Sequence, residues 1–386
     1  MRSPRVLVVH NRYRVEGGEE RSVELQLRAL RRAGVEHALL ERRSAEATRA
    51  GAAAALLRGG AERDVAAAVR ELGADVVHVH NMLPLLGPRA LAAARAAGAA
   101  VVLHLHNLRL FCAIGVASRD GGPCFRCHHR FTLPGLVLNC RRSLPEAAVY
   151  AVALAGHQPT VLGAVDRFVA PSDYAVGQLA RLGVPRGRLT PLPHYLPEEA
   201  FVEGSRAGDG TYALAAARLS PEKGIDVAIA AATRTGVPLR VAGEGPARAE
   251  LEALARRLGA PVEFLGRVGR AEVAGLLAGA GALLMPSRYH EFAPYAALEA
   301  MAAGVPVLAS ALGGLPELIG RERCLRRNDA GALAERLGKL WADPARRRVD
   351  GDALIARARE RHGEEAFTRR LLALYAPLVG VRAATH

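Results

Sequence analysis

Aromatic residues are scarce in this sequence: eight Phe, eight Tyr and one Trp make up 4% of its 386 residues. Proteins that bind single-stranded nucleic acids stack the bases on aromatic side chains. The scarcity therefore argues against that class of protein, although the formal net charge is +14. The positive charge instead favours nucleotides, phosphorylated lipids or an anionic membrane surface as partners, or it reflects arginine spread over solvated faces.

Long apolar runs are also missing. The first run, at residues 6–9, is too short for the core of a secretion signal, and no stretch approaches the roughly 18–20 apolar residues of a membrane span. We therefore expect a cytoplasmic protein, either free or peripheral at the inner face of the membrane. The segment "HNRYRVEGGEE" after the first predicted strand lacks the G-x-G-x-x-G fingerprint, which argues against a dinucleotide-dependent dehydrogenase.

The length and the patterning of the chain predict an α/β protein of two domains. A chain of 386 residues is too long for one ordinary hydrophobic core. Short apolar runs alternate with helical patterns in both halves, which is typical of doubly wound parallel sheets with helices on both faces. The predicted strands lie at 5–10, 34–41, 74–80, 100–106, 166–172, 211–217, 238–242, 262–265, 281–285 and 305–309.

The predicted domain plan has four parts. Residues 1–195 form an N-terminal Rossmann-like domain with a cysteine-rich insertion at about 107–145, and residues 196–210 form a linker. Residues 211–362 form the second Rossmann-like domain, and residues 363–386 form a C-terminal helix that packs back on the first. Ligands of such sheets bind beyond the carboxyl ends of the strands, so we expect a ligand in a cleft between the domains.

Two glutamates lie around the start of a helix predicted at about 294–303. Pro294 suits the first turn of a helix, where a missing N–H costs nothing, and Gly304 suits its end. Glu291 then precedes the positive end of the helix, and Glu299 lies inside it. Free N–H groups at such an end bind phosphates, and nearby carboxylates can accept hydrogen bonds from sugar hydroxyls. The alternative is an acid that complements the helix dipole, together with a solvated glutamate.

A basic loop follows the first predicted strand of the second half. In "ARLSPEKG" (217–224), Arg218 and Lys223 come directly after the strand. The forked guanidinium of arginine and the compact ammonium of lysine together suit a pyrophosphate. Loops are often basic without such a role. The two cations therefore support a pyrophosphate site only because we expect them to lie opposite the helix start near residue 294.

Several motifs occur together, in an order typical of one enzyme family. They are "GGEERSVELQLRALRRAG", "DVVHVHN", "VAPSDYAVGQLARLGV", "RLSPEKG", "VAGEGP", "FLGRV" and "SRYHEFAPYAALEAMAAGVPVLASALGGLPELI", the last with an E-x7-E spacing. In combination they resemble glycosyltransferase family 4, whose members are retaining enzymes of the GT-B fold. The resemblance covers almost the whole chain. It implies an acceptor-side first domain and a second domain that binds a nucleotide sugar.

The resemblance also implies a role for each matching residue. Arg218 and Lys223 bind the donor diphosphate, Glu291 lies near the transferred sugar, and Glu299 holds the nucleotide ribose. His106 corresponds to the active-site histidine beside that sugar, and His104 points to the same side. The other donor-binding positions are Gly17 and Gly18, which close over the phosphates, Val268, which borders the base, and the backbone around Tyr295 and Ala296.

The implied reaction is sugar transfer with retention from a nucleoside-diphosphate sugar to a glycan, lipid-linked or small-molecule acceptor. No enzyme nucleophile is evident, so the leaving phosphate assists the acceptor, and no cofactor is required. Ala293 and Pro294 stand where the family usually has Phe and Gly, which leaves the donor sugar open. The alternatives are a GT-B enzyme without acceptor transfer, either epimerase or hydrolase-like, and a catalytically silent zinc-bearing binding module.

Four of the five cysteines follow a C-x11-C-x2-C-x12-C pattern, at Cys112, Cys124, Cys127 and Cys140. A C-x2-C pair with two further thiolates suits one tetrahedral structural zinc, and His128 or His129 could replace a thiolate. The alternative is four free thiols.

Basic residues at 126–142 precede an apolar stretch at 147–156 that is predicted to be helical. They favour either contact with an anionic membrane that carries a lipid-linked acceptor or a core helix beside a solvated loop.

Overall fold

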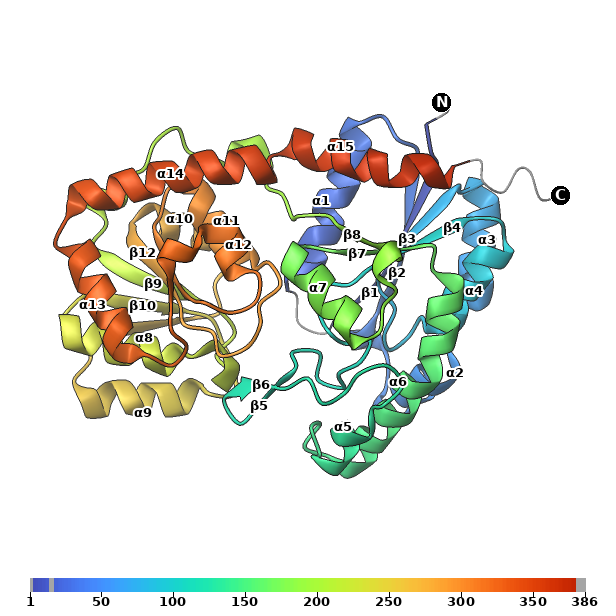
Figure 1. Cartoon of the computed structure of the whole chain (residues 1–386), viewed down its shortest axis with the longest axis horizontal. Coiled ribbons are helices and arrows are strands. Elements are labelled where there is room, and N and C mark those ends of the chain that lie inside the picture. Colours follow the sequence, from blue (N-terminus) through green and yellow to red (C-terminus); the bar gives the residue numbers. More distant parts are fainter. Residues whose placement is uncertain (1–2, 14–16, 380–386) are drawn as a thin grey trace. The chain divides into compact units, whose positions relative to one another are not determined.

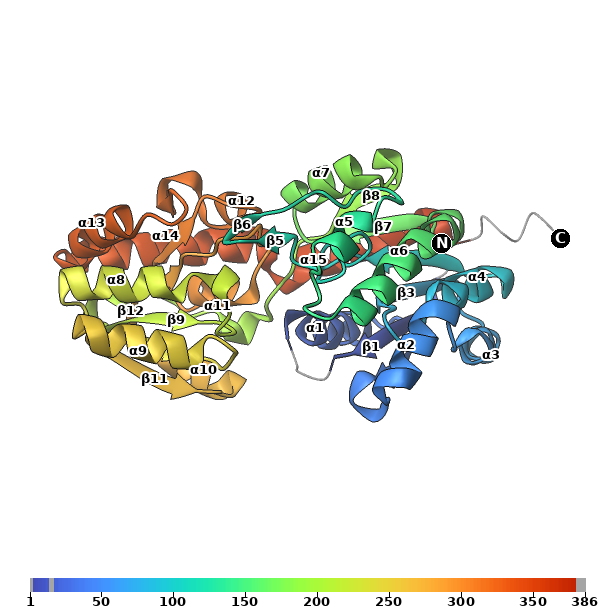
Figure 2. The ribbon, with the colours of Figure 1, turned by 90° about the horizontal axis from the view of Figure 1, so that it is seen from below.

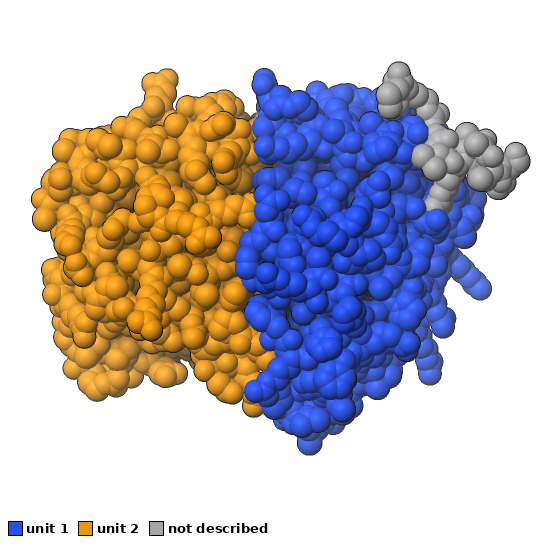
Figure 3. Space-filling view, in the orientation of Figure 1, with its two compact units in different colours: residues 1–117, 125–193, 365–386 blue, residues 118–124, 194–364 orange. Residues whose placement is uncertain are grey.

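The computed structural model describes residues 3–13 and 17–379. Within this part of the chain there are two compact units, drawn in blue and orange in Figure 3. Unit 1 contains the residues up to Ala117, Phe125–Pro193 and the residues from Glu365 onward. Unit 2 contains Ser118–Cys124 and His194–Glu364. Both units are α/β, and Figures 1 and 2 show helices on the two faces of each sheet.

Unit 1 is built on a six-stranded parallel sheet in the order β2-β1-β3-β4-β7-β8. Every residue of β3 and β4 is buried, as expected of parallel strands covered on both faces. The strands are β1 (Val6–Arg12), β2 (His37–Arg43), β3 (Val76–Asn81), β4 (Ala100–His104), β7 (Arg167–Ala170) and β8 (Leu189–Pro191).

Eight helices belong wholly or largely to unit 1 in the described chain. They are α1 (Gly18–Arg32), α2 (Arg49–Arg58), α3 (Glu62–Leu72), α4 (Pro88–Ala96), α5 (Leu133–Val137), α6 (Leu144–Ala164), α7 (Asp173–Leu182) and α15 (Glu364–Tyr375). The apolar stretch predicted as a helix at 147–156 is the middle of α6, which has 21 residues. Neither α6 nor any other helix of the described residues combines the length and apolar character that a membrane crossing needs.

Unit 2 contains a second parallel sheet in the order β11-β10-β9-β12-β13-β14. Alternate residues of β9 face two separate core clusters: Leu214 lies in one, and Ala213 and Ala215 lie in the other. The strands are β9 (Tyr212–Ala216), β10 (Leu239–Ala242), β11 (Val262–Gly266), β12 (Ala280–Met285), β13 (Val307–Ser310) and β14 (Cys324–Leu325). Successive strands run outward from β9 to β11 and then resume on the other side at β12, so the strand order reverses between β9 and β12.

Seven helices cover the faces of the unit 2 sheet in the described chain. They are α8 (Ile225–Thr235), α9 (Arg248–Leu258), α10 (Arg270–Ala278), α11 (Tyr295–Ala302), α12 (Leu315–Ile319), α13 (Ala330–Trp341) and α14 (Pro344–His362). α14 and α15 are separated only by Gly363. The chain thus passes from unit 2 to unit 1 after the first residue of α15.

The structure differs from the sequence-based assignment at three places. Edge strands β8 and β14 have only three and two residues, too few for a periodic signal. β4 ends at His104 rather than at His106. The stretch 107–145, predicted to be irregular, contains α5 and a small antiparallel hairpin of β5 (Ser118–Arg119) and β6 (Gly122–Pro123).

Candidate functional site

The carboxyl ends of β9 and β12 meet where the strand order of unit 2 reverses. A 3-10 turn at Pro221–Lys223 follows β9, and Gly224 comes next with φ +67°. A Cβ at Gly224 would lie 2.1 Å from the carbonyl oxygen of Pro286, just after β12. This approach requires glycine, and the left-handed φ favours it as well. The glycine therefore holds Lys223 beside the loop that follows β12.

Lys223, Tyr289 and Glu291 form one hydrogen-bonded cluster in that position. The Lys223 ammonium nitrogen lies 2.7 Å from Glu291 Oε1 and 3.0 Å from the Tyr289 hydroxyl oxygen. Tyr289 donates to Glu291 Oε2 over 2.5 Å, and the Ser287 hydroxyl donates to Oε1 over 3.0 Å. Because the Glu291 side chain is only 6% exposed, this ion pair is partly shielded from water.

Burial and charge fix the protonation states in this cluster. Burial on its own would lower the pKa of Lys223, but the Glu291 carboxylate and Tyr289 raise that pKa well above its ordinary value. Burial raises the pKa of Tyr289, and the Glu291 carboxylate raises it further. Lys223 is therefore a cation and Tyr289 a neutral phenol at any working pH.

The backbone of Glu291 is fixed by the loop that follows β13. The N–H of Gly314 donates to the carbonyl of Glu291 over 2.7 Å. Gly313 has φ +64°, and a Cβ there would lie 2.1 Å from the same carbonyl oxygen. The position of the carboxylate thus depends on the loops after β9, β12 and β13, all at one edge of the sheet.

Two arginines near this edge differ in whether their guanidinium groups have partners. Arg288 donates to the Pro221 carbonyl over 3.0 Å and to Asn328 Oδ1 over 2.5 Å, and it pairs with Asp226. Arg218 is exposed, and its guanidinium has no hydrogen-bond or ion-pair partner among the described residues. Arg288 therefore braces the loops, whereas Arg218 remains available to a bound anion.

The predicted helix after Glu291 is present as α11, but it begins one residue later than expected. Pro294 has ψ 129° and is the N-cap, so it lies outside the helix rather than in its first turn. At the other end α11 finishes at Ala302, one residue before the expected end, and Gly304 terminates it as predicted. Gly304 has φ +69°, its N–H donates to Met301, and the next N–H, of Val305, donates to Ala300, which is the Schellman arrangement.

The remaining predicted donor-binding residues of unit 2 are half-buried. Val268 lies after β11, and Tyr295 and Ala296 occupy the first turn of α11. All three pack against the same core cluster. Glu299 is also half-buried, one turn further along α11. The ring of His194 stacks on that of Tyr295 with centroids 4.5 Å apart, which fixes the start of the helix.

In unit 1, the predicted Gly17–Gly18 pair lies at the N-terminus of α1. Gly17 is the N-cap, and its N–H donates to Glu20 Oε2 over 2.7 Å, while the N–H of Tyr13 donates to Oε1 over 3.0 Å. Burial would raise the pKa of Glu20, but the His10 ring, whose Nε2 lies 3.6 Å from Oε1, and the hydrogen bonds from these backbone groups lower it to about 2. A carboxylate thus already complements this helix end. Residues 14–16 of the same predicted loop lie outside the described residues.

Glu19, the next residue toward the N-terminus, has the opposite electrostatic behaviour. Its carboxylate accepts hydrogen bonds from the Tyr13 hydroxyl, over 3.3 Å, and from the Asn107 amide. Burial raises the pKa of Glu19 to about 7, and the Arg109 guanidinium opposes this rise. Two adjacent acids therefore have pKa values on opposite sides of the ordinary value.

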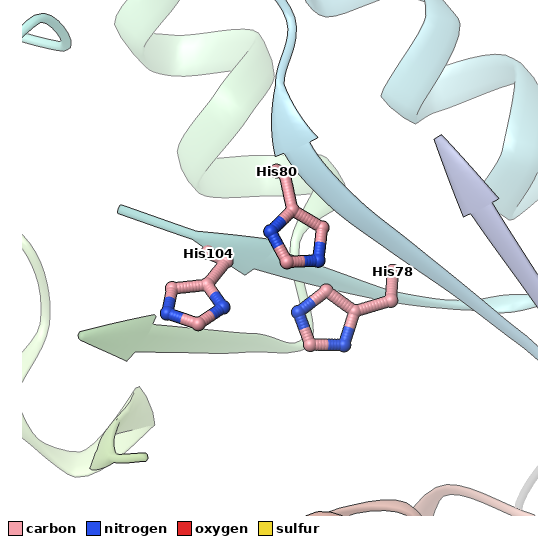
Figure 4. A group of neighbouring side chains, drawn as sticks. All are labelled: His78, His80 and His104. Carbon is pink, nitrogen blue, oxygen red and sulfur yellow. The ribbon is translucent and has the colours of Figure 1, made fainter. Parts of the chain in front are cut away.

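The predicted active-site histidine lies in a group of histidines from β3 and β4. His106 follows β4 by two residues, its ring stacks on His104 with centroids 4.0 Å apart, and its Nε2 lies 2.9 Å from Nδ1 of His80. His78, His80 and His104 offer nitrogen atoms that all lie within 4.8 Å of one another (Figure 4). Within the described residues, no other group of three or more His, Cys, Asp or Glu side chains has the spacing of metal ligands.

The four cysteines of the predicted zinc site have free thiols and are half-buried. Cys112, Cys127 and Cys140 belong to unit 1, and Cys124 belongs to unit 2. Burial raises the pKa of the Cys112 thiol, and Cys140 raises it further. Without a metal, the thiolate form that zinc binds is therefore disfavoured at Cys112. Zinc binding by these cysteines stays a prediction.

Sequence reasoning missed several residues that support the predicted ones. Ser287 and Tyr289 precede Glu291 in "PSRYHE", and a polar run directly after a buried strand was the available signal. His78 and His80 alternate along β3 and therefore face the same side of the sheet. Gln26 on α1 and Tyr375 on α15 could not be found in this way, because their contacts with these histidines span many residues of chain.

Two family models match this chain, and together they span most of it. Residues 17–194 match the model described as "Glycosyl transferase 4-like domain", and residues 198–360 match "Glycosyl transferases group 1". The D-inositol 3-phosphate glycosyltransferase of Streptomyces avermitilis is 33% identical over 219 residues, which is 52% of this chain and 41% of that protein. Alignments with the curated relatives span about half of their length or less.

Solved structures with the same fold cover nearly the whole chain. Sucrose-phosphate synthase from Thermosynechococcus elongatus superimposes with a TM-score of 0.72 at 20% identity, over 98% of this chain and 99% of that one. Anabaena Alr3699/HepE in complex with UDP-glucose gives 0.68 at 16% identity, over 96% and 99%. With two parallel six-stranded sheets and both family models, the chain belongs to glycosyltransferase family 4 and has the GT-B fold.

Proposed function

We propose that this protein transfers a sugar, with retention, from a nucleoside-diphosphate sugar to a hydroxyl of an acceptor. The observation that carries the proposal is the Lys223–Glu291 pair at the reversal of strand order in unit 2. Sheets of this kind bind their ligands at that place. A lysine held charged there by a partly shielded carboxylate provides a permanent positive charge for a diphosphate.

The donor site is assigned from this centre outward. Lys223 and the exposed Arg218 contact the diphosphate, together with backbone N–H groups at the start of α11. Glu299 accepts hydrogen bonds from the ribose, and Val268 borders the base. The family membership supports this arrangement, as does the Anabaena structure of the same fold, which was determined with UDP-glucose.

The reaction breaks the bond between the anomeric carbon and the diphosphate oxygen. The electron pair of that bond goes to the diphosphate, where Lys223 and Arg218 stabilise the developing charge in fixed positions. The acceptor oxygen forms the new bond on the same face of the sugar, and its proton passes to the departing phosphate oxygen. Glu291 keeps Lys223 in place on the donor side, and His106 contacts the transferred sugar.

The donor assignment can be tested by calorimetry and product analysis. UDP, GDP and ADP would be titrated into the protein, and a panel of their sugar derivatives would be incubated with it and followed by mass spectrometry. Lys223→Ala should lose affinity for the preferred nucleotide by about tenfold or more, the value of a charge-assisted hydrogen bond. The sequence has only one other lysine, Lys339, so Lys339→Ala is the matched control. No binding by any nucleoside diphosphate would overturn the proposal.

The acceptor side of unit 1 is suited to an anionic membrane that carries a lipid-linked acceptor. α5 packs on α6, and large apolar side chains in this region are 50–71% exposed: Phe131, Leu133, Val137, Leu144 and Val152. Exposed Arg126, Arg130 and Arg142 lie in the same stretch. Apolar side chains beside arginines are typical of surfaces that rest on anionic lipid.

Vesicle sedimentation tests this contact. The protein should sediment with phosphatidylglycerol vesicles and remain in solution with phosphatidylcholine vesicles. Val137→Ser should weaken sedimentation, whereas Val349→Ser, which alters an apolar side chain of unit 2 that is 61% exposed, should not. Equal sedimentation of the two variants would contradict the assignment.

A structural zinc is proposed for Cys112, Cys124, Cys127 and Cys140 on the basis of their spacing. Elemental analysis of the purified protein should give one zinc per chain, and thiol titration without denaturant should leave those four unreactive. Absence of zinc together with four reactive thiols would exclude it. Cys324, outside the pattern, is the internal control.

A further inference from the structure

The start of α11 differs from the start of α1 in how its N–H groups are used. At α1, the N–H of the N-cap Gly17 donates to the carboxylate of Glu20. At α11, the N-cap is Pro294, which makes no side-chain hydrogen bond to the helix, and the N–H of Ala296 has no hydrogen-bond partner among the described residues. The first turn of α11 therefore keeps a donor for a ligand, but no capping side chain fixes its direction.

The ring of His194 packs against this first turn instead. His194 is 7% exposed, and its imidazole stacks on the Tyr295 phenol ring with centroids 4.5 Å apart and the ring planes 21° from parallel. Burial, and to a smaller extent His362, lowers the pKa of His194 to about 3, so the imidazole is neutral. The contact is therefore a stack of two uncharged rings, and it fixes where the first residue of α11 lies.

The backbone around His194 is in turn held by the end of α14. Nδ1 of His362, the last residue of α14, lies 2.6 Å from the carbonyl oxygen of His194. A carbonyl oxygen only accepts hydrogen bonds, so Nδ1 of His362 carries a proton and donates it. The N–H of Leu196 donates back to the carbonyl of His362 over 3.0 Å. His194 is therefore tied to α14 through its backbone and contacts α11 through its ring.

We propose that His194 is a positioning residue of the donor site, whose ring, anchored through His362, orients the first turn of α11 so that the N–H of Ala296 meets the diphosphate. The donor contact rests on the proposed function, whereas the orientation of the turn depends only on contacts within unit 2. The competing interpretation is a core contact that adds stability to unit 2 without a specific effect on phosphate binding.

Calorimetry separates the two interpretations by comparing a nucleoside diphosphate with the matching nucleoside, which has no phosphate for α11 to contact. His194→Ala removes the ring and should weaken binding of the diphosphate about fivefold, the value of one aromatic pair, with binding of the nucleoside unchanged. His194→Phe keeps a stacked ring and should bind both ligands as the wild-type protein does. His157→Ala removes an imidazole of unit 1 that is 6% exposed, so it is the control for loss of a buried histidine.

A second pair of variants tests the anchor. In His362→Asn the side-chain amide places an N–H close to the position of Nδ1, so the hydrogen bond to the His194 carbonyl is kept. His362→Leu has no donor there. We expect His362→Leu to weaken diphosphate binding as His194→Ala does, and His362→Asn to retain it. Equal diphosphate affinity in these two variants would contradict the anchoring role of His362.

Hydrogen exchange without nucleotide tests the orientation of the turn independently of the proposed function. The N–H groups of Ala297 and Leu298 donate to the Pro294 carbonyl. In His194→Ala they should exchange about fivefold faster, because the stack that holds the first turn is lost. The amides of the unit 2 strands should keep their wild-type rates.

Unchanged diphosphate affinity in His194→Ala, or equal losses in His194→Ala and His194→Phe, would overturn the positioning role. Equal losses of diphosphate and nucleoside affinity, or faster exchange throughout unit 2, would also overturn it, since either result indicates a general loss of stability. No binding of any nucleoside diphosphate to the wild-type protein would instead reject the proposed function and the donor contact together. Faster exchange confined to the first turn of α11 would then still confirm that His194 orients that turn.

Discussion

The two units have closely similar architecture and different chemistry at their sheet edges. Unit 2 has the order β11-β10-β9-β12-β13-β14 and places a lysine–glutamate pair at its reversal point, whereas unit 1 has the order β2-β1-β3-β4-β7-β8 and carries histidines on β3, on β4 and just after β4. Fixed charge suits a diphosphate, whereas imidazoles, which can donate and accept hydrogen bonds, suit hydroxyl groups. A fold repeated within one chain thus supports two kinds of recognition through the loops that follow its strands.

The largest expected effect is on turnover, in unit 2. Lys223→Ala removes the cation that we propose faces the leaving diphosphate, and kcat should fall by about 10²–10³, as for the loss of one transition-state donor. Steady-state kinetics with the preferred nucleotide sugar would measure this fall. Lys339→Ala should have no effect on kcat. A normal kcat in Lys223→Ala would mean that the Lys223 ammonium does not act in the reaction.

The two glutamates of unit 2 should differ in their effect on stability. Glu291→Ala leaves a shielded ammonium without its carboxylate, which should lower the free energy of unfolding by about 3 kcal/mol. Glu299→Ala should reduce turnover sharply while lowering stability by less than about 1 kcal/mol. Urea unfolding of both variants makes the comparison. Equal losses of stability would show that Lys223 does not need Glu291 to remain charged.

Two tyrosine variants compare a phenol hydrogen-bonded to charged groups, Tyr289 in unit 2, with a phenol hydrogen-bonded to neutral groups, Tyr375 in unit 1. Tyr289→Phe removes hydrogen bonds to charged partners and should cost about 1.5–3 kcal/mol, whereas Tyr375→Phe removes hydrogen bonds between neutral groups and should cost about 1 kcal/mol. Thermal or urea unfolding would rank the two. The reverse order would contradict the assignment of charged partners to Tyr289 and of neutral partners to Tyr375.

The last expected effect is a change of pH dependence within unit 1. The folded-state pKa of Glu19 is about 7 against an ordinary 4.5, so the stability it contributes is present below pH 4.5 and is lost as pH rises through about 7. Glu20, with a folded-state pKa of about 2, behaves in the opposite way and loses its contribution only as pH falls toward 2. Glu19→Gln should therefore reduce the decline in unfolding free energy between pH 4.5 and 7. Exposed Glu24→Gln is the control, and an unchanged slope in Glu19→Gln would contradict the burial of that carboxyl.

Sequence reasoning located most of the strands and singled out Lys223 and Glu291. It failed where two residues in contact are far apart along the chain. The βα alternation located ten of the twelve strands of the two sheets, because buried parallel strands have a strong local pattern. Lys223 was singled out from its position after a strand, and Glu291 from its position before a helix. Their direct pairing was not predicted, since it depends on the approach of Gly224 to Pro286. The contact of Tyr375 with His78 was equally inaccessible, because 297 residues separate the two, and no local periodicity reports such contacts.

The return of the chain to unit 1 after unit 2 has a consequence for how the protein can be divided. The buried residues Phe367, Leu371 and Tyr375 of α15 belong to the same unit as the first 117 residues. A polypeptide ending at 193 would expose the apolar surface that α15 covers. Gln26 and His78 would also lose their hydrogen bonds to the Tyr375 hydroxyl. Neither half is therefore an independent module that a single cut could release. Loss of α15 should destabilise unit 1, which contains the N-terminal residues, rather than unit 2.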